Sequence, residues 1–326
     1  MLCIVSENTD PYFNLASEEY LLKKFTEELF LLYRNEPSIV VGKHQNTFSE
    51  INYRYVLENN IKVARRISGG GTVFHDLGNL NFSFITTGEP GFLIDYKKYL
   101  VPVVKALATL GLKAGISDRN HLFIKGKKIT GTASHVYRNR VMHHGTLLFS
   151  SEMSDLAAAL KSAPGNYTDK AVKSVRSRVT NIRDHLNRDM DVLEFRDIIL
   201  SHILNYFENS KIYTYSKYDL KEIARLKLSK FARWEWNFGY SPKYHFEKEI
   251  VTKGGVLEIN LNVAKGVIED ISVKGDFINL GEVKVIEDLI TGTIHDPVAI
   301  RMKLSKIKVP EIILGVEMED LVAGMF

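Results

Sequence analysis

The sequence predicts an α+β protein built around a mixed β-sheet, and two observations support this prediction. Helical and strand-like patterns interleave irregularly along the chain, and several strands come in hairpin-like pairs. A doubly wound parallel sheet would alternate strands and helices more regularly. At roughly 150 residues per domain, the 326 residues suggest about two domains. We expect a large domain over residues 1–240, with a mixed sheet flanked by helices, and a small α+β domain over residues 241–326.

Apolar spacing and capping residues place the elements of the large domain. Asn14 can cap a first helix whose apolar stripe includes Leu15 and Phe25. Short apolar runs bounded by charge or by Pro37 are too short for good helices, so we interpret them as strands. Gly111 can end a later helix. In chain order, the expected helices span 14–25, 52–60, 95–110, 154–160 and 193–207, and the strands span 29–33, 38–42, 61–67, 80–86, 122–124, 128–134 and 145–150.

The small domain begins with a clear hairpin pattern. Residues 256–263 alternate between apolar and polar side chains, Gly266 marks a turn, and residues 268–273 form the partner strand. Helices are expected near 282–290, 297–307 and 318–325. The linker 234–242 contains both tryptophans of the chain, which favours a surface where the domains dock over a site that stacks on a ligand.

Composition excludes several classes of protein. The 43 basic and 39 acidic residues give a formal net charge of +4, too small a bias for a nucleic-acid-binding protein. Hydrophobic residues make up 45% of the chain and charged residues 25%, as in ordinary globular proteins. No apolar run approaches the roughly 18 residues of a membrane span. The single cysteine, Cys3, excludes internal disulfides and a cysteine-based zinc site.

The N-terminal residues carry an acid, Glu7, and no basic region of the kind that starts a signal peptide. We therefore expect a cytoplasmic protein that binds neither nucleic acid nor membranes.

The segment 65–84, RRISGGGTVFHDLGNLNFSF, is the most informative stretch of the sequence. Glycine tolerates positive φ and lets a ligand approach the backbone, and successive N–H groups in such a turn can bind an anion. Two arginines precede the glycines, and His75 and Asp76 follow them. The segment fits neither a Walker A loop nor GxGxxG. It indicates a carboxylate or phosphate site, and the alternative is a tight turn with solvated arginines.

The segment 123–149 places Lys128 ahead of Gly131 and several small residues, where backbone can meet a ligand. Lys128 is thus a candidate clamp for a phosphate or carboxylate, although Lys125, Lys127 and Lys128 can each also be solvated turn residues. His143 and His144 are adjacent on a predicted strand, so they point to opposite faces and are poor joint metal ligands. A third segment, 170–186, carries five basic residues before its first acidic residue, Asp184. It is either a solvated face or a mobile loop that closes over a polyanion.

These three segments, with PYFNLASEEYLL near the start and WEWNFG in the linker, resemble the lipoate–protein ligase A family. The blocks RRISGGGTVFHDLGN, KITGTA, HHGTLL and SVRSRVTN occur in the order of the family, and together they are specific. The resemblance implies a large catalytic domain like that of biotin protein ligases and a small accessory domain. It also implies a reaction in two steps: lipoate and ATP form lipoyl-adenylate, and the lipoyl group then passes to a lysine of a lipoyl domain.

The resemblance also implies roles for individual residues. Lys128 matches the essential lysine of the family, which can bridge the lipoyl carbonyl oxygen and the adenylate phosphate. Residues 174–181 match the loop that orders over the adenylate and shields it from water. The positions expected to bind ATP or lipoyl-adenylate are Arg65, Arg66, Ser68, Gly69, Gly70, Gly71, Thr72, Val73, Phe74, His75, Asn120, Lys128, Thr130, Gly131, His144 and Arg176.

The implied small molecules are ATP with Mg²⁺ and (R)-lipoate, and no metal ligand is assigned in the chain. The implied partners are lipoyl domains of 2-oxoacid dehydrogenase complexes and the glycine cleavage H protein. Such domains tend to be acidic near the target lysine, which would suit the basic run 170–183.

One departure from the family pattern bears on the first step. The family usually has Arg-Asn-Asp where this chain has Arg119, Asn120 and His121. The alternative function is therefore an amidotransferase of the same fold that transfers lipoyl or octanoyl groups without activating them with ATP. A covalent cysteine route is not expected, since Cys3 lies far from the motifs. A non-catalytic binder would have lost Lys128 or the glycines, and the HHGTLL block disfavours a biotin ligase.

Overall fold

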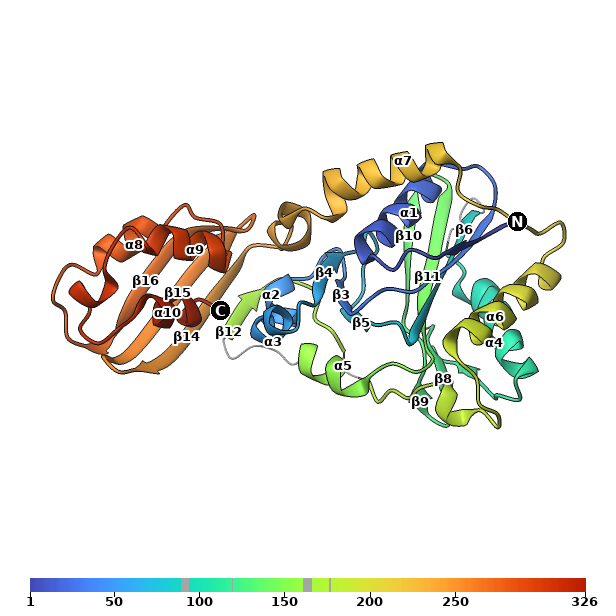
Figure 1. Cartoon of the computed structure of the whole chain (residues 1–326), viewed down its shortest axis with the longest axis horizontal. Coiled ribbons are helices and arrows are strands. Elements are labelled where there is room, and N and C mark those ends of the chain that lie inside the picture. Colours follow the sequence, from blue (N-terminus) through green and yellow to red (C-terminus); the bar gives the residue numbers. More distant parts are fainter. Residues whose placement is uncertain (89–93, 119, 161–165, 176) are drawn as a thin grey trace. The chain divides into compact units, whose positions relative to one another are not determined.

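The computed structural model describes residues 1–88, 94–118, 120–160, 166–175 and 177–326 (Figure 1). The chain divides into two compact units, and each unit is assembled from three separate segments. The larger unit comprises Met1–Lys43, Asn59–Ala159 and Ser174–Arg233, and the smaller unit comprises His44–Glu58, Leu160–Lys173 and Trp234–Phe326. The smaller unit thus includes two segments that precede residue 234. The functional division at residue 240 stays a prediction.

A six-stranded mixed sheet forms the centre of the larger unit, with strands in the order β10-β11-β6-β2-β1-β13. Strand β1 runs parallel to both of its neighbours, and the other pairs are antiparallel. The strands span Leu2–Ser6 (β1), Leu29–Tyr33 (β2), Asn79–Thr87 (β6), Thr132–Tyr137 (β10), Arg140–Leu148 (β11) and Lys211–Ile212 (β13). The predicted α+β class with a mixed sheet is confirmed.

Two small sheets carry the sequence motifs. Strand β3 pairs in parallel with β4 and antiparallel with β5, so the glycine-rich segment lies between the end of β4 and the start of β5. The antiparallel sheet β7-β8-β9 ends on the strand that contains Lys128. Their bounds are Ser38–Val41 (β3), Lys62–Arg65 (β4), Val73–His75 (β5), Gly115–Ile116 (β7), Leu122–Ile124 (β8) and Lys127–Lys128 (β9).

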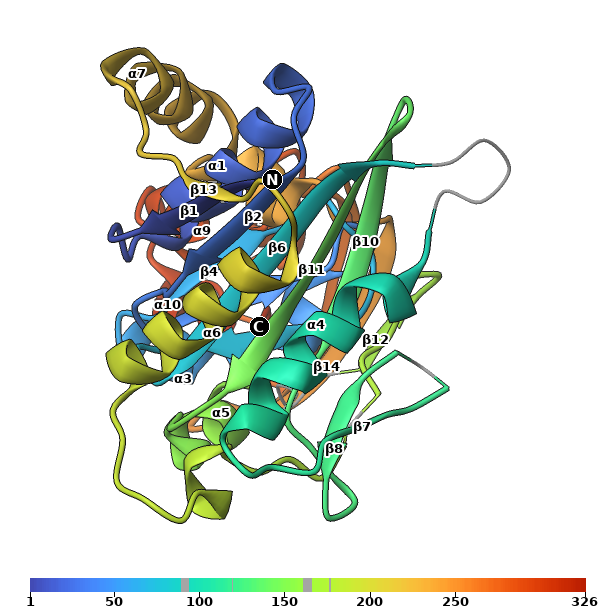
Figure 2. The same cartoon turned by 90° about the vertical axis from the view of Figure 1, so that its right-hand side faces the viewer.

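Helices cover both faces of the large sheet. Helix α1 contacts β6 and β11 on one face and packs against α7. Helices α4 and α6 pack against each other on the opposite face (Figure 2). The aromatic side chains of Phe30 on β2 and of Phe82 and Phe84 on β6 are buried in the same core as these helices. The helices of this unit span Pro11–Lys24 (α1), Tyr96–Thr109 (α4), Met153–Ala159 (α5), Val192–Tyr206 (α6) and Lys217–Leu226 (α7). Within the described ranges, every helix falls short of the length and apolar character that crossing a bilayer requires.

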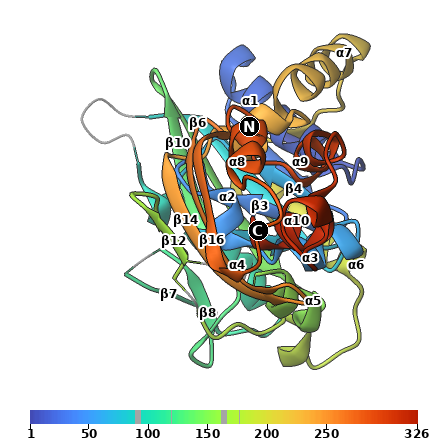
Figure 3. The same ribbon diagram turned by 90° about the vertical axis from the view of Figure 1, so that its left-hand side faces the viewer.

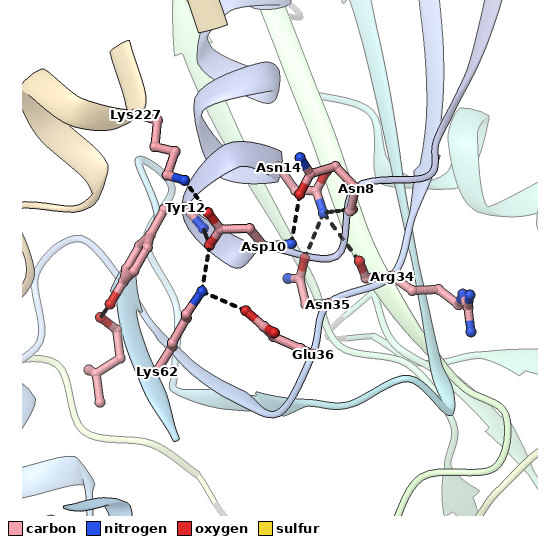
Figure 4. A network of polar contacts seen from close by, with 10 residues as sticks. Asn8, Asp10, Tyr12, Asn14, Arg34, Asn35, Glu36, Lys62 and Lys227 are labelled. Carbon is pink, nitrogen blue, oxygen red and sulfur yellow. Dashed lines mark hydrogen bonds and ion pairs between the residues drawn. The ribbon is translucent and has the colours of Figure 1, made fainter. Parts of the chain in front are cut away.

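The start of α1 is held by a polar network (Figure 4). Asp10 caps the helix by accepting a hydrogen bond from the backbone N–H of Tyr12, and Pro11 suits the first helical position. The Asp10 carboxylate also pairs with Lys62 at 3.2 Å and Lys227 at 2.5 Å. Buried Asn14 donates to the carbonyl oxygens of Asn8 and Arg34. These bonds fix the helix that carries Glu18.

The structure differs from the expected elements in several places. The strand expected over 128–134 is broken after Lys128, because the backbone N–H and C=O of Lys128 pair with Arg178 and Thr180 instead of continuing along β10. The strand expected over 145–150 begins earlier, because a tight hairpin turn with Arg138 at φ 56° leads directly into β11 at Arg140. Helix α7 and strand β14 (Tyr244–Thr252) were not among the expected elements, although Leu220, Ile223 and Ala224 of α7 have the spacing of an amphipathic helix.

The smaller unit is a four-stranded antiparallel sheet in the order β12-β14-β15-β16, with helices packed on it (Figure 3). The predicted hairpin is present, and both turn residues, Lys265 at φ 52° and Gly266 at φ 74°, adopt the left-handed conformation. Its other elements are β12 (Asn166–Asp169), β15 (Gly255–Ala264), β16 (Val267–Phe277), α2 (Thr47–Glu50), α3 (Tyr53–Glu58), α8 (Lys284–Ile290), α9 (Pro297–Leu304) and α10 (Met318–Gly324).

Both early segments are built into this unit. Strand β12 pairs with β14, and Phe48 of α2 is 2% exposed in the same core as the hairpin. Buried His295 stacks on Phe326 at 4.4 Å and also contacts Phe48. Trp234 of the linker stacks on Phe238 within the same unit.

Candidate active site

The glycine turn, Gly69–Gly71, is held from inside by Arg66. Nη2 of Arg66 donates to the carbonyl oxygens of Gly69 and Gly71 at 2.7 Å each, and Nη1 donates to the carbonyl of Val40 at 2.9 Å. Gly70 has φ 89°, the left-handed conformation that favours glycine. Because the guanidinium binds the carbonyls of the turn, those carbonyls point inward, and the turn is shaped by a buried cation.

Burial lowers the pKa of Arg66 to about 10, and the negative charge of Glu18 opposes this effect. The side chain is only 6% exposed, so its hydrogen bonds to the turn compensate for lost water. Arg65 is fully buried and donates to the carbonyl oxygens of Gly42 and Lys43 at 3.0 and 3.1 Å. Both predicted arginines therefore have scaffold contacts, and their contact with a substrate stays a prediction.

Ser68 and His144 meet behind the turn. Nε2 of His144 lies 2.7 Å from Oγ of Ser68, which also accepts a hydrogen bond from Nε of Arg66 at 3.0 Å. Nδ1 of His144 lies 3.0 Å from both carboxylate oxygens of Glu18 on α1. The neighbouring His143 points to the opposite face, where its ring stacks on Tyr99 of α4. The expectation that the two histidines point to opposite faces is confirmed.

The side chain of Lys128 lies close to Gly131 of its own segment and to Val73 of the glycine-rich segment. A Cβ atom placed on Gly131 would lie 3.7 Å from both Cε and Nζ of Lys128 and 3.9 Å from the side chain of Val73. Burial lowers the pKa of Lys128. Among the described residues, no carboxylate lies within ion-pair distance of its ammonium group. The charge is thus half-buried and available to an anionic ligand.

The third motif also reaches this place. Oγ of Ser174 accepts a hydrogen bond of 2.8 Å from the backbone N–H of Thr72, and a Cβ atom on Gly71 would approach Ser174 to 3.1 Å. Further along, Arg178 and Thr180 pair with the backbone of Lys128. Within the larger unit, the structure therefore brings Ser174, Arg178 and Thr180 of the third segment to the first two motifs. Arg176, a predicted binding residue, lies outside the described residues.

The remaining predicted residues shape the surroundings. Thr130 is buried and its hydroxyl donates to the carbonyl of Thr146, whereas Phe74 is 2% exposed and part of the core. Asn120 has φ 59° and accepts a hydrogen bond from the hydroxyl of Thr132 at 2.6 Å through its carbonyl oxygen. The backbone N–H of His121 donates to Oγ of Ser117, which closes the same turn.

His75 is buried beside this network. Its Nδ1 accepts a hydrogen bond of 2.9 Å from the side-chain amide of Asn35. Burial lowers the pKa of His75 to about 3, with further lowering by Arg66 and His144, so the ring is neutral at physiological pH. Its Nε2 is buried without a hydrogen-bond partner among the described residues. A neutral ring that accepts at Nδ1 carries its proton at Nε2, so His75 offers one unused donor.

Sequence reasoning missed Glu18 and Tyr33. The segment PYFNLASEEYLL contains Glu18, but two adjacent acids in a helix ordinarily face water. Only the contact with β11, which places His144 opposite α1, explains its burial. Nothing in the strand LFLLY marks the hydroxyl of Tyr33 as a donor to Glu18.

The chain is similar to known proteins over most of its length. Residues 10–204 match the family model of the lipoyl protein ligase A/B catalytic domain, and residues 241–324 match that of the bacterial lipoate protein ligase C-terminus. The chain is 42% identical over 290 residues to lipoate–protein ligase 1 of Staphylococcus aureus, covering 88% of each chain. It is also 42% identical over 297 residues to the lipoate-protein ligase LplJ of Bacillus subtilis, covering 90% of each.

Among solved structures, the chain resembles lipoate-protein ligase A bound with ATP, with 25% identity and a TM-score of 0.63 over 73% of this chain and 98% of that chain. It also resembles the bipartite lipoate protein ligase of Thermoplasma acidophilum, studied with its E2 lipoyl domain, with 25% identity and a TM-score of 0.64 over 73% of this chain and 96% of that chain. The chain belongs to the lipoyl protein ligase A/B family.

Proposed function

We propose that this protein is an ATP-dependent lipoate–protein ligase. It activates lipoate to lipoyl-adenylate and transfers the lipoyl group to a lysine of an acceptor domain. The observation that supports this most directly is the ammonium group of Lys128, half-buried beside Gly131 and Val73 and without a carboxylate partner among the described residues. The relatives named above are lipoate–protein ligases, and one related structure holds ATP.

In the first step, a carboxylate oxygen of lipoate attacks the α-phosphorus of ATP. An oxygen–phosphorus bond forms, and the bond to the departing pyrophosphate breaks. Negative charge on the transferring phosphate is then stabilised by the Lys128 ammonium and by the N–H groups near the glycine turn. The turn is already held by Arg66, so its N–H groups need little reorganisation when the charge develops.

In the second step, the amine of the acceptor lysine attacks the carbonyl carbon of the mixed anhydride. The carbon–nitrogen bond forms, AMP leaves with the electrons of the carbon–oxygen bond, and the amine loses a proton. Lys128 stabilises the transient oxyanion. Ser174, bonded to Thr72, and Arg178 and Thr180, bonded to Lys128, are suited to cover the anhydride and exclude water.

The role of Mg²⁺ stays a prediction. The described residues contain no group of three carboxylate, imidazole or thiol side chains that could hold a metal ion. Mg²⁺ commonly binds through one or two carboxylates together with substrate phosphates. The side chains thus do not form a dedicated cage, and no step above depends on one.

The acceptors we propose are lipoyl domains of 2-oxoacid dehydrogenase complexes and the glycine cleavage H protein. A related ligase was studied with an E2 lipoyl domain, which supports the domain type. The accessory role of residues 241–326 and a place in the cytoplasm stay predictions from the sequence.

The test is lipoate-dependent release of pyrophosphate from ATP and Mg²⁺ without an acceptor protein. We expect release, because activation precedes transfer. If release is absent while supplied lipoyl-adenylate is still used to lipoylate an acceptor, the protein is instead an amidotransferase that lacks activation. His121 would then be the first residue to replace.

A further inference from the structure

Glu18 is a buried carboxylate with a defined set of partners. It lies on α1, is 1% exposed, and has both oxygens 3.0 Å from Nδ1 of His144. The hydroxyl of Tyr33 donates to the same carboxylate at 3.1 Å. A buried carboxylate is costly unless such donors compensate it. The site chemistry described above does not use Glu18 directly.

A series of hydrogen bonds connects Glu18 to the glycine turn through His144, Ser68 and Arg66, and donors and acceptors can be assigned along it without conflict. When Glu18 accepts from Nδ1 of His144, a ring that carries its proton at Nδ1 accepts at Nε2 from the hydroxyl of Ser68, 2.7 Å away. The oxygen of Ser68 in turn accepts from Nε of Arg66 at 3.0 Å. Every proton along the path from Arg66 to Glu18 then has an acceptor.

The path ends on the turn itself. Arg66 holds the carbonyl oxygens of Gly69 and Gly71 at 2.7 Å each, and the carbonyl of Ser68 accepts from the backbone N–H of Lys43 at 2.8 Å. Rotation of the guanidinium would release both glycine carbonyls together. The hydrogen bond at Nε restrains that rotation together with the bond from Nη1 to the carbonyl of Val40, since each fixes the plane of the guanidinium at a further point.

We propose that Glu18 and His144 are positioning residues that hold the glycine turn in its anion-binding shape through Ser68 and Arg66. This inference rests on the proposed role of that turn in binding the anionic substrates. It assigns a positioning role to Glu18 and His144, and the predicted contact of His144 with a ligand stays a prediction.

The chain offers a matched control on the adjacent residue. Nδ1 of His143 lies 2.8 Å from Oγ of Ser134, so it also forms a histidine–serine pair. This pair lies on the opposite face of β11, against Tyr99, and none of its hydrogen bonds leads to the glycine turn. His143→Gln therefore perturbs a similar pair without perturbing the turn.

The experiment is a double-mutant cycle between Glu18 and Ser68, which do not touch. Glu18→Gln lets an amide N–H donate to Nδ1, so Nε2 carries the proton and Ser68 receives two donors. Ser68→Ala removes the hydroxyl that connects His144 to Arg66. We measure kcat and KM for ATP in lipoate-dependent pyrophosphate release, with the melting temperature of each variant.

We expect Glu18→Gln and Ser68→Ala each to lower kcat/KM for ATP by roughly 10- to 100-fold, with a raised KM, because a misplaced turn binds the phosphates poorly. In the Ser68→Ala background, Glu18→Gln should have almost no further effect, as for residues that act as a unit. A merely structural role would lower the active fraction and leave KM unchanged. His143→Gln should leave KM for ATP unchanged.

The proposal fails if Glu18→Gln lowers kcat/KM by the same factor with and without Ser68, since Glu18 would then act independently. If Glu18→Gln does not fold, His144→Gln takes its place in the same cycle and is judged by the same criterion. Wild-type protein that releases no pyrophosphate would instead contradict the proposed function, and that result is separate from the outcome of the cycle.

Discussion

The backbone N–H of Thr72 donates a 2.8 Å hydrogen bond to Oγ of Ser174, which joins the glycine-rich segment to the basic segment about a hundred residues later. The basic segment is also paired with the backbone of Lys128 through Arg178 and Thr180. The basic segment is therefore attached at two places, to the backbone of Thr72 and to that of Lys128. Loss of one attachment should affect protection of the intermediate more than its formation.

Replacing Ser174 by alanine tests this relationship. The variant should release AMP and lipoate faster without an acceptor, because water reaches the anhydride, while pyrophosphate release changes by less than about threefold. Exposed Ser177 provides the matched control, since Ser177→Ala removes a hydroxyl from the same segment. Equal hydrolysis of the intermediate in both variants would remove the role assigned to Ser174.

Lys128→Ala should lower the rate of lipoyl-adenylate formation by roughly 100- to 1,000-fold, the usual effect of removing one group that stabilises transition-state charge. The melting temperature should not fall, because the ammonium has no ion-pair partner among the described residues. Lys127→Ala, which changes the exposed neighbour on β9, is the control. Lipoyl-adenylate formation at a near wild-type rate in Lys128→Ala would contradict the mechanism.

Alanine substitutions at two neighbouring glycines of the turn differ in backbone conformation and in what the added Cβ atom would contact. Gly70 has φ 89°, and a Cβ atom there would lie 3.1 Å from Nη2 of Arg66, so Gly70→Ala should cost about 1–2 kcal/mol of stability and raise KM for ATP. A Cβ atom on Gly69 would meet nothing within 4 Å. Gly69→Ala should therefore be nearly neutral for stability. Thermal melting and initial rates compare them, and similar losses in both variants would show that backbone conformation is not the cause.

Acid should destabilise the protein through buried neutral histidines. Burial lowers the pKa of His295 to about 4, while the unfolded chain has its ordinary value near 6.5. The unfolded state therefore binds the proton first, and stability that is fully present above pH 6.5 is lost as the pH falls toward 4. At 1.36 kcal/mol per pKa unit, the total loss is about 3 kcal/mol.

Denaturant unfolding at pH 7 and pH 5 measures this effect, and His295→Gln should reduce the difference between the two. Burial also lowers the pKa of His75 to about 3 and of His143 to about 4, so some acid sensitivity persists in the variant. A variant with the same pH dependence as the wild type would exclude His295 as a cause.

Several parts of this fold could be predicted because they depend on local patterns. Asp95 was placed at the start of a helix, and it caps α4 by accepting from the backbone N–H of Lys98. The hairpin around Gly266 follows from strict alternation of apolar side chains. The interruption after Lys128 could not be predicted, because it is caused by Arg178 and Thr180, which are distant in sequence.

The residues of the candidate site were also predicted only where the local sequence marks them. Glycines, arginines and Lys128 were identified because their residue types are unusual in that order. Glu18 was missed because its importance depends on burial opposite His144, and a helix sequence does not record which strand covers it. The sequence also could not show that Arg66 binds carbonyl oxygens of the turn, since the same arginine could equally face a ligand.

The smaller unit cannot be removed from the chain, or added to it, as one continuous segment. A polypeptide starting at residue 241 would lack β12, which pairs with β14, and would leave a cavity where Phe48 fills the core. Truncation or fusion near residue 240 therefore exposes a strand edge and apolar surface, both of which promote aggregation. In this chain, separating the two units would require transferring the segments His44–Glu58 and Leu160–Lys173 along with the C-terminal residues.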